Sequence, residues 1–150
     1  MDYPSPEPRS GGASLATLLP HALPPCPNAR VALFAIRRMG AHGLADARAG
    51  QAMLTTFGQG FRRPLTLTRA LMADLAGHAK GAIAIAPCCC ARVTPAESAL
   101  LAVFASAETR PDRARLLLAD LLGSRSVDGV LASALAVAIA FADGGRPIGG

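Results

Sequence analysis

Six apolar segments with helical periodicity, most of them separated from one another by glycine or proline, constrain the fold of this chain more than any other feature. In each segment apolar residues recur every three to four positions, as in a helix that buries one face. The helices are expected at about 28–39, 44–57, 64–78, 95–107, 109–122 and 127–142. Because the connections are short and no long internal repeat is present, the sequence predicts an all-α fold, a compact antiparallel bundle of five to six short helices.

Local signals support three of these helices. The run Thr94-Pro95-Ala96-Glu97 combines a capping threonine, a first-turn proline and a glutamate at the reciprocal capping position, so a helix is expected to start there. Asn28 is expected to cap the helix that ends near Met39. The last helix is apolar on almost every side, which predicts a position in the middle of the bundle.

The segment 82–86, Ala-Ile-Ala-Ile-Ala, is the one stretch that alternates with a period of two. Such alternation is typical of an extended segment. Because no obvious partner strand is found elsewhere in the chain, we expect no sheet larger than a hairpin.

Proline and glycine mark the domain limits. Residues 1–12 alternate proline with polar residues and offer no apolar surface to bury, which predicts a disordered Pro-rich tail. Residues 13–143 are expected to form a single helical domain, because a chain of 150 residues can build one core without a metal or a disulfide. Residues 144–150 are expected to be a flexible C-terminus.

Neither a secretory signal nor a membrane span is expected. The first residues lack a basic region followed by an apolar one. The longest uncharged stretch, 129–142, is shorter than the roughly 20 residues that cross a bilayer. We therefore expect a cytoplasmic protein that does not enter a membrane.

The balance of charge favours acidic partners. The chain carries 15 Lys and Arg against 10 Asp and Glu, a formal net charge of +5. Arginines lie next to aromatic residues in two places, a pattern typical of grooves that bind single-stranded nucleic acid. They are Arg30, Arg37 and Arg38 around Phe34, and Arg62 and Arg63 after Phe61. One hypothesis is that they bind a nucleic acid or an acidic protein; the alternative is a solvated face on which arginine stems cover apolar surface.

Three of the four cysteines, Cys88, Cys89 and Cys90, are contiguous, and Cys26 is the fourth. In a reducing cytoplasm they are expected as thiols, and they can simply fill gaps between helices. The alternative is a thiol-based metal-binding or redox-sensing site, in which zinc would be held by Cys26, Cys88, Cys90 and His21. A disulfide between neighbours is disfavoured, because adjacent α-carbons lie only about 3.8 Å apart.

The sequence contains no recognisable catalytic motif, so we expect neither enzymatic activity nor a cofactor. Charged residues make up only 17% of the chain, against about 25% in typical domains, which leaves apolar helix faces to cover. The hypothesis is a small adaptor or regulatory protein that forms a homodimer through Leu101 and Phe104. On this hypothesis Phe104→Glu would shift the dimer toward monomer and leave the helices intact.

Two resemblances complete the sequence analysis. Residues 37–90 resemble a small uncharacterised bacterial family of unknown function, which implies no activity. Residues 94–128 resemble, in the order of their landmarks, the winged-helix DNA-binding domains of response regulators, which implies a helical scaffold. The landmarks are Thr94-Pro95-Ala96-Glu97, Leu100-Leu101, Leu117-Leu118, Leu122-Gly123 and Arg125-Ser126-Val127-Asp128. Because apolar residues and glycine follow Asp128 where that family has arginines, no DNA contact is carried over.

Overall fold

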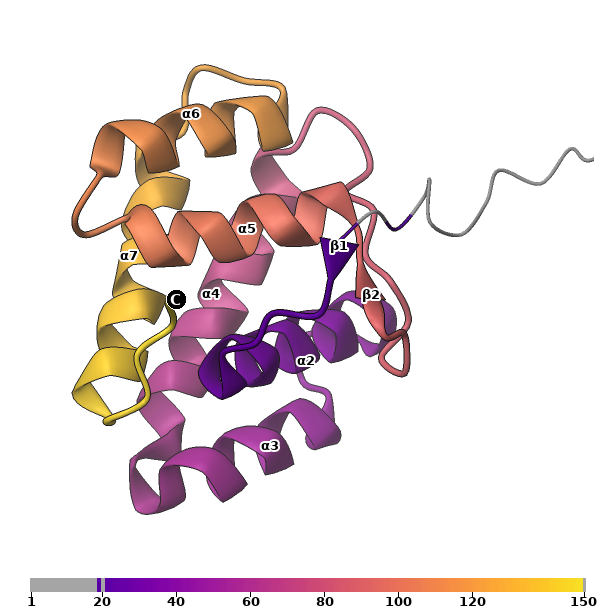
Figure 1. Ribbon diagram of the computed structural model, residues 1–150, viewed down its shortest axis with the longest axis vertical. Helices are drawn as coiled ribbons and strands as arrows, with labels where there is room; N and C mark the ends of the chain where they lie inside the picture. The colour runs from indigo at the N-terminus through magenta and orange to yellow at the C-terminus, as the bar shows by residue number, and fades with distance from the viewer. Residues whose placement is uncertain (1–18, 20, 150) are drawn as a thin grey trace, which may run out of the picture.

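Helices dominate the part of the chain described by the computed structural model, which is residue 19 and residues 21–149 (Figure 1). The α-helices are α2 (Pro27–His42), α3 (Ala47–Phe57), α4 (Arg62–His78), α5 (Pro95–Ser106), α6 (Pro111–Leu122) and α7 (Asp128–Asp143). A 3-10 helix, η1 (Gly58–Phe61), joins α3 to α4. The all-α prediction is confirmed, whereas the predicted tail, residues 1–12, lies outside the described residues.

Helix α4 runs through the middle of the molecule and packs along α7 (Figure 1). Helices α5 and α6 pack on each other on one side of this pair, and α2 and α3 pack on each other on the other side (Figure 1). The sequence predicts the last helix in the middle of the bundle; α7 instead lies along one edge of the molecule, where it packs on α4, α5 and α6 (Figure 1). Among the described residues, no helix combines the length and the apolar character needed to cross a membrane.

Two helices begin at other residues than the sequence predicts. Helix α2 starts at Pro27 with Cys26 at the capping position, and the Asn28 side chain donates instead to the carbonyl oxygen of Pro147, at 2.9 Å. Helix α3 starts at Ala47 rather than near residue 44. Its start is set by the preceding aspartate, whose carboxylate accepts a hydrogen bond from a backbone N–H of the first turn.

The predicted start of α5 is confirmed in detail. The Thr94 side chain accepts a hydrogen bond from the Glu97 backbone N–H at 3.0 Å, and the Glu97 carboxylate accepts one from the Thr94 backbone N–H at 2.9 Å. This reciprocal pair satisfies two backbone donors that have no partner inside the helix. The signal is local, so the sequence could predict it.

The small sheet is formed by other residues than the extended segment that the sequence indicates. Strands β1 (His21–Ala22) and β2 (Arg92–Val93) pair antiparallel, whereas the alternating segment 82–86 forms no strand. That segment belongs to the long connection between α4 and β2, residues 79–91, which we call the strap. Strands of two residues are too short to show an alternating pattern, so the sequence could not predict them.

The C-terminal residues that the structure describes are packed, so the predicted domain limit at residue 143 is too early. After α7 the chain turns back beside α2 (Figure 1). Ile148 is only 8% exposed and belongs to the hydrophobic core. The carbonyl oxygen of Pro147 accepts the hydrogen bond from Asn28. The buried Ile148 side chain and this hydrogen bond both hold the segment against the domain.

A pH-dependent contribution to stability is expected from Asp46, which accepts two hydrogen bonds from Arg38, at 2.8 and 3.0 Å. These bonds outweigh the effect of burial and lower the pKa of Asp46 to about 2. In the unfolded chain an aspartate has a pKa near about 3.9. The stabilisation is therefore present above about pH 4 and is lost as the pH falls toward about 2.

We expect the free energy of unfolding of wild-type protein to exceed that of Asp46→Asn at neutral pH, and the difference to shrink between about pH 4 and pH 2. Urea unfolding of both proteins across this range measures it. A difference that stays constant with pH would contradict the prediction.

Candidate functional site

The four residues predicted to bind zinc lie on three different segments of the chain. Cys26 lies at the start of α2, His21 lies in β1, and Cys88 and Cys90 lie in the strap. Over residues 21–149, no three His, Cys, Asp or Glu side chains come close enough together to hold a metal ion. The chain folds without assembling the predicted ligand set, so the described residues give no support for a zinc site.

The thiol of Cys26 has its own environment at the N-terminus of α2. Burial would raise its pKa, but the backbone N–H groups of Gly149, Ala29 and Asn28 donate to the sulfur and hold the pKa below its ordinary value. The sulfur also lies 3.9 Å from the carbonyl oxygen of Pro147. Cys26 therefore joins the start of α2 to the C-terminal segment.

The predicted arginine cluster on α2 is divided among different environments. Arg37 is only 2% exposed, so it does not belong to a solvated binding face, and the prediction of partner binding is wrong for this residue. Arg38 is held by Asp46, and Arg30 donates to the carbonyl oxygen of Pro24 at 2.6 Å. The arginines of this one helix therefore lie in different surroundings, and the apolar periodicity of the helix gave no sign that Arg37 is buried.

The second predicted cluster stays at the surface. Arg62 and Arg63 are both exposed. The Arg62 guanidinium lies 6.0 Å from the centre of the Phe61 ring, and Arg63 pairs with Asp143 at 2.7 Å across α4 and α7. An exposed ion pair of this kind contributes little to stability.

Phe104, predicted to form a dimer interface, lies in the core instead. It is only 3% exposed and packs within the hydrophobic cluster of the domain, and its neighbour Leu101 is half-buried. The apolar face of α5 is covered by the chain's own helices, chiefly α6 and α7. In this structure the side chain of Phe104 is therefore not exposed to a second copy of the chain.

A buried ion pair between Arg37 and Glu97 links α2 to the start of α5. The carboxylate of Glu97 accepts from Arg37 Nε at 2.9 Å and Nη2 at 3.0 Å, and also from the backbone N–H groups of Ala86 at 2.8 Å and Thr94 at 2.9 Å. Burial alone would raise the pKa of Glu97, but these hydrogen bonds, foremost those from Arg37, hold it below its ordinary value. The Glu97 side chain is therefore a carboxylate at neutral pH.

The same ion pair holds the strap in place. Arg37 Nη1 donates to the carbonyl oxygen of Cys90 at 2.8 Å, and the Ala86 N–H donates to Glu97. Further along the strap, the Thr94 hydroxyl donates to the carbonyl oxygen of Ala84 at 2.7 Å. At its beginning, the Lys80 N–H donates to a carbonyl oxygen at the end of α6, at 3.1 Å. The strap is thus anchored along its length although it has no regular secondary structure.

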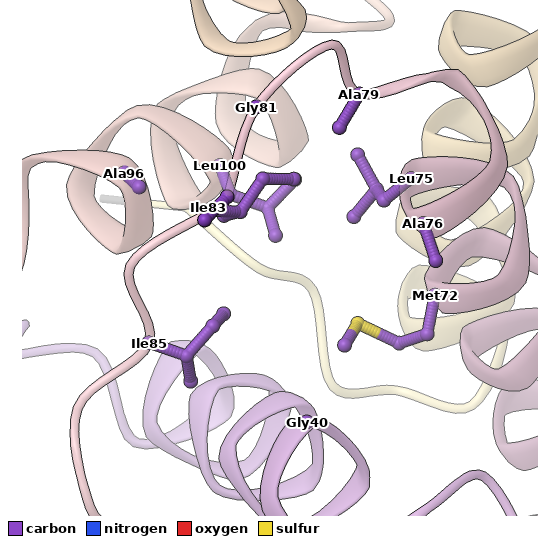
Figure 2. A pocket seen from close by; sticks show the side chains of 11 residues that line it. Gly40, Met72, Leu75, Ala76, Ala79, Gly81, Ile83, Ile85, Ala96 and Leu100 are labelled. Atoms are coloured by element: carbon purple, nitrogen blue, oxygen red, sulfur yellow. The ribbon is translucent and has the colours of Figure 1, made fainter.

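An apolar pocket of about 310 Å³, which we call the strap hollow, lies between the strap and helices α2, α4 and α5 (Figure 2). Leu75 and Leu100 are almost completely buried, whereas Met72, Ile83 and Ile85 are half-buried and point into the space (Figure 2). The lining consists of Gly40, Met72, Leu75, Ala76, Ala79, Gly81, Ala82, Ile83, Ile85, Ala96 and Leu100. None of these side chains is ionisable.

Two further hollows adjoin the first along the strap. One, of about 320 Å³, lies toward α5 and α6. The other, of about 370 Å³, lies beside the end of α2. Ile83 borders all three hollows, whose linings are mainly apolar but include Asp120 in the second and Arg37 in the third. The sequence analysis noted segment 82–86 for its alternation, but nothing in it indicated a pocket, because residues of several elements build the walls.

A family model matches residues 13–114, and its family is described as a family of unknown function, DUF6628. The match covers more than half of the chain. The chain belongs to the DUF6628 family. The resemblance of residues 37–90 to an uncharacterised family is thereby confirmed. The residues that DUF6628 matches include the whole lining of the strap hollow and the Arg37–Glu97 ion pair.

Neither the curated proteins nor the solved structures contain a match to this member of the DUF6628 family. The likeness of residues 94–128 to winged-helix domains therefore has no support from these comparisons. In the described part of the fold, the helix that would correspond to a DNA-reading helix is α7, which buries Val130 and Leu131 against its neighbours.

Proposed function

We propose that this DUF6628-family protein is a small adaptor without catalytic activity, which binds an apolar segment of a partner protein in the strap hollow. The observation that carries the proposal is the lining of the hollow, which consists only of glycine, aliphatic and methionine side chains. Such a surface offers no nucleophile, acid or base. What it offers is the free energy of removing apolar groups from water.

The shape of the apolar surface supports a chain segment as the occupant. The three hollows that meet at Ile83 lie side by side along the strap. A single compact molecule would fill one of them, whereas successive side chains of one segment can enter neighbouring hollows. Methionine, here Met72 in the wall, adapts its shape to different side chains.

The backbone of the strap gives a second reason to propose a chain segment as the occupant. Ala84 and Ala86 direct backbone groups toward the start of α5, where they are paired. In the part of the chain that the structure describes, the backbone groups of Ile83 and Ile85 make no hydrogen bond within the protein. An extended partner segment could pair with them, as in strand addition to an open edge.

The net charge of the protein favours one kind of partner segment over others. The net charge of +5 favours a segment flanked by acidic residues. A nucleic acid is less well suited to the hollow, because the lining offers no side-chain donor to a phosphate.

The four free thiols suit the reducing conditions of the cytoplasm, which we propose as the compartment. Self-association stays a prediction, and with Phe104 in the core it would need exposed apolar side chains such as Leu116.

The proposal predicts the outcome of a selection from a displayed library of random peptides. Selected peptides should share one or two large apolar anchor residues. Ala76→Glu should weaken their binding at least about tenfold, because an exposed alanine that lines the hollow is replaced by a charge. Burial of one leucine-sized anchor contributes roughly 1.5–3 kcal/mol, and about 1.4 kcal/mol corresponds to tenfold in affinity.

Ala73→Glu is the matched control. Ala73 lies one turn earlier on α4, is also exposed and does not line the hollow, so this variant should bind as the wild type does. Equal binding by the wild type and Ala76→Glu, or selected peptides without apolar anchors, would contradict the proposal.

A further inference from the structure

Cys88 and Cys90 share one small cavity at the turn of the strap. The turn runs from Pro87 to Cys90 and is closed by the Cys90 N–H, which donates to the carbonyl oxygen of Pro87 at 3.0 Å. Both cysteines line the same cavity of about 130 Å³, and both are half-buried. Cys89, which lies between them, is exposed and does not line this cavity. Two of the three contiguous cysteines thus border the same cavity and the third does not.

The turn suits a disulfide between these two residues. Residues two positions apart span at most about 7 Å when fully extended, and a turn shortens this distance, which brings Cys88 and Cys90 into the α-carbon range of about 4.4–6.8 Å that disulfides use. Directly adjacent cysteines are too close, at about 3.8 Å. The carbonyl oxygen of Cys90 is held by the buried Arg37 at 2.8 Å. The backbone is therefore positioned before any bond forms.

Arginine side chains border the cavity that Cys88 and Cys90 line. Arg30 lines the same cavity. The pKa of Arg38 lies above its ordinary value, foremost because of its hydrogen bond to Asp46, and the charge of Cys88 adds to the rise. Arg37 lines the cavity as well, so two guanidinium-bearing side chains border the space that both cysteines share.

We propose that Cys88 and Cys90 form a redox-active dithiol, which is oxidised to an intramolecular disulfide by a low-molecular-weight disulfide such as oxidised glutathione. The Cys88 thiolate attacks one sulfur of the oxidant, which breaks the S–S bond of the oxidant and releases one glutathione thiolate. The Cys90 thiolate then attacks the Cys88 sulfur of the mixed disulfide and releases the second glutathione. The protein loses two protons and two electrons, and the oxidant is reduced to two thiols. This activity does not depend on the proposed binding of a partner segment.

Oxidation of the purified full chain with oxidised glutathione tests the proposal. After oxidation, two of the four cysteines should no longer react with an alkylating agent, and the intact mass should fall by two hydrogen atoms without added glutathione. Peptide mapping should place the bond between Cys88 and Cys90. The Ala76→Glu variant should oxidise as the wild type does, which separates this proposal from the adaptor proposal.

The variants Cys88→Ser, Cys89→Ser and Cys90→Ser provide matched controls within one turn. Cys89→Ser should still close the disulfide. Cys88→Ser and Cys90→Ser should stop at a mixed disulfide with glutathione, with circular dichroism verifying that each variant is folded. The proposal is overturned if the wild type keeps four reactive thiols or stops at the mixed disulfide. It is also overturned if Cys89→Ser prevents closure, or if the bond in the wild type involves Cys26.

Discussion

Phe104→Glu is expected to unfold the protein rather than to change its oligomeric state. Phe104 is only 3% exposed and packs in the main hydrophobic cluster. Removing a buried phenylalanine side chain costs about 3–5 kcal/mol, and a carboxylate without a partner in the same place adds a further penalty. Because domains of this size are stable by only about 5–15 kcal/mol, little or no stability should remain.

Far-ultraviolet circular dichroism and thermal melting measure this outcome. The variant should lose most of its helical signal or its cooperative transition. Leu116→Glu on α6 is the control, because Leu116 is 71% exposed and its replacement should change the free energy of unfolding by no more than about 0.5 kcal/mol. A Phe104→Glu variant that melts like the wild type would show that the core is not packed as described.

Glu97→Ala is expected to lower the free energy of unfolding by about 3–5 kcal/mol, because it leaves a buried charge without its partner. The Arg37 guanidinium would remain almost fully buried. The backbone N–H groups of Ala86 and Thr94 would also lose their acceptor. The strap should loosen as well, since two of its contacts depend on this ion pair.

Urea unfolding measures the loss, with Asp143→Ala as the matched control. Asp143 forms an ion pair with Arg63 whose side chains are 57% and 58% exposed, so its removal should cost less than about 1 kcal/mol. The double variant Arg37→Met with Glu97→Met should recover part of the loss, because it also removes the buried charge. Equal costs for Glu97→Ala and Asp143→Ala would contradict the interpretation.

The candidate site shows where prediction from sequence ends. Glu97 is identified from sequence as a capping residue, because its partner Thr94 lies three positions away. Its second partner, Arg37, lies 60 residues earlier in the chain. Nothing in the sequence around Arg37 distinguishes it from an arginine at the surface. No local pattern connects the two. The strap hollow depends in the same way on residues from Gly40 to Leu100, which meet only when the helices pack.

The sequence by itself determined the helices, several of their ends and the membership of a family of unknown function. Helical hydrogen bonds and caps join residues within about four positions, so the residues that decide them are neighbours in the chain. Only the tertiary structure decided that Phe104 is core, that Arg37 is buried, that Ile148 returns to the domain and that β1 meets β2. Each of these features depends on contacts between residues that lie tens of positions apart. A periodic pattern predicts which face of a helix is buried, but it does not predict which other element covers that face.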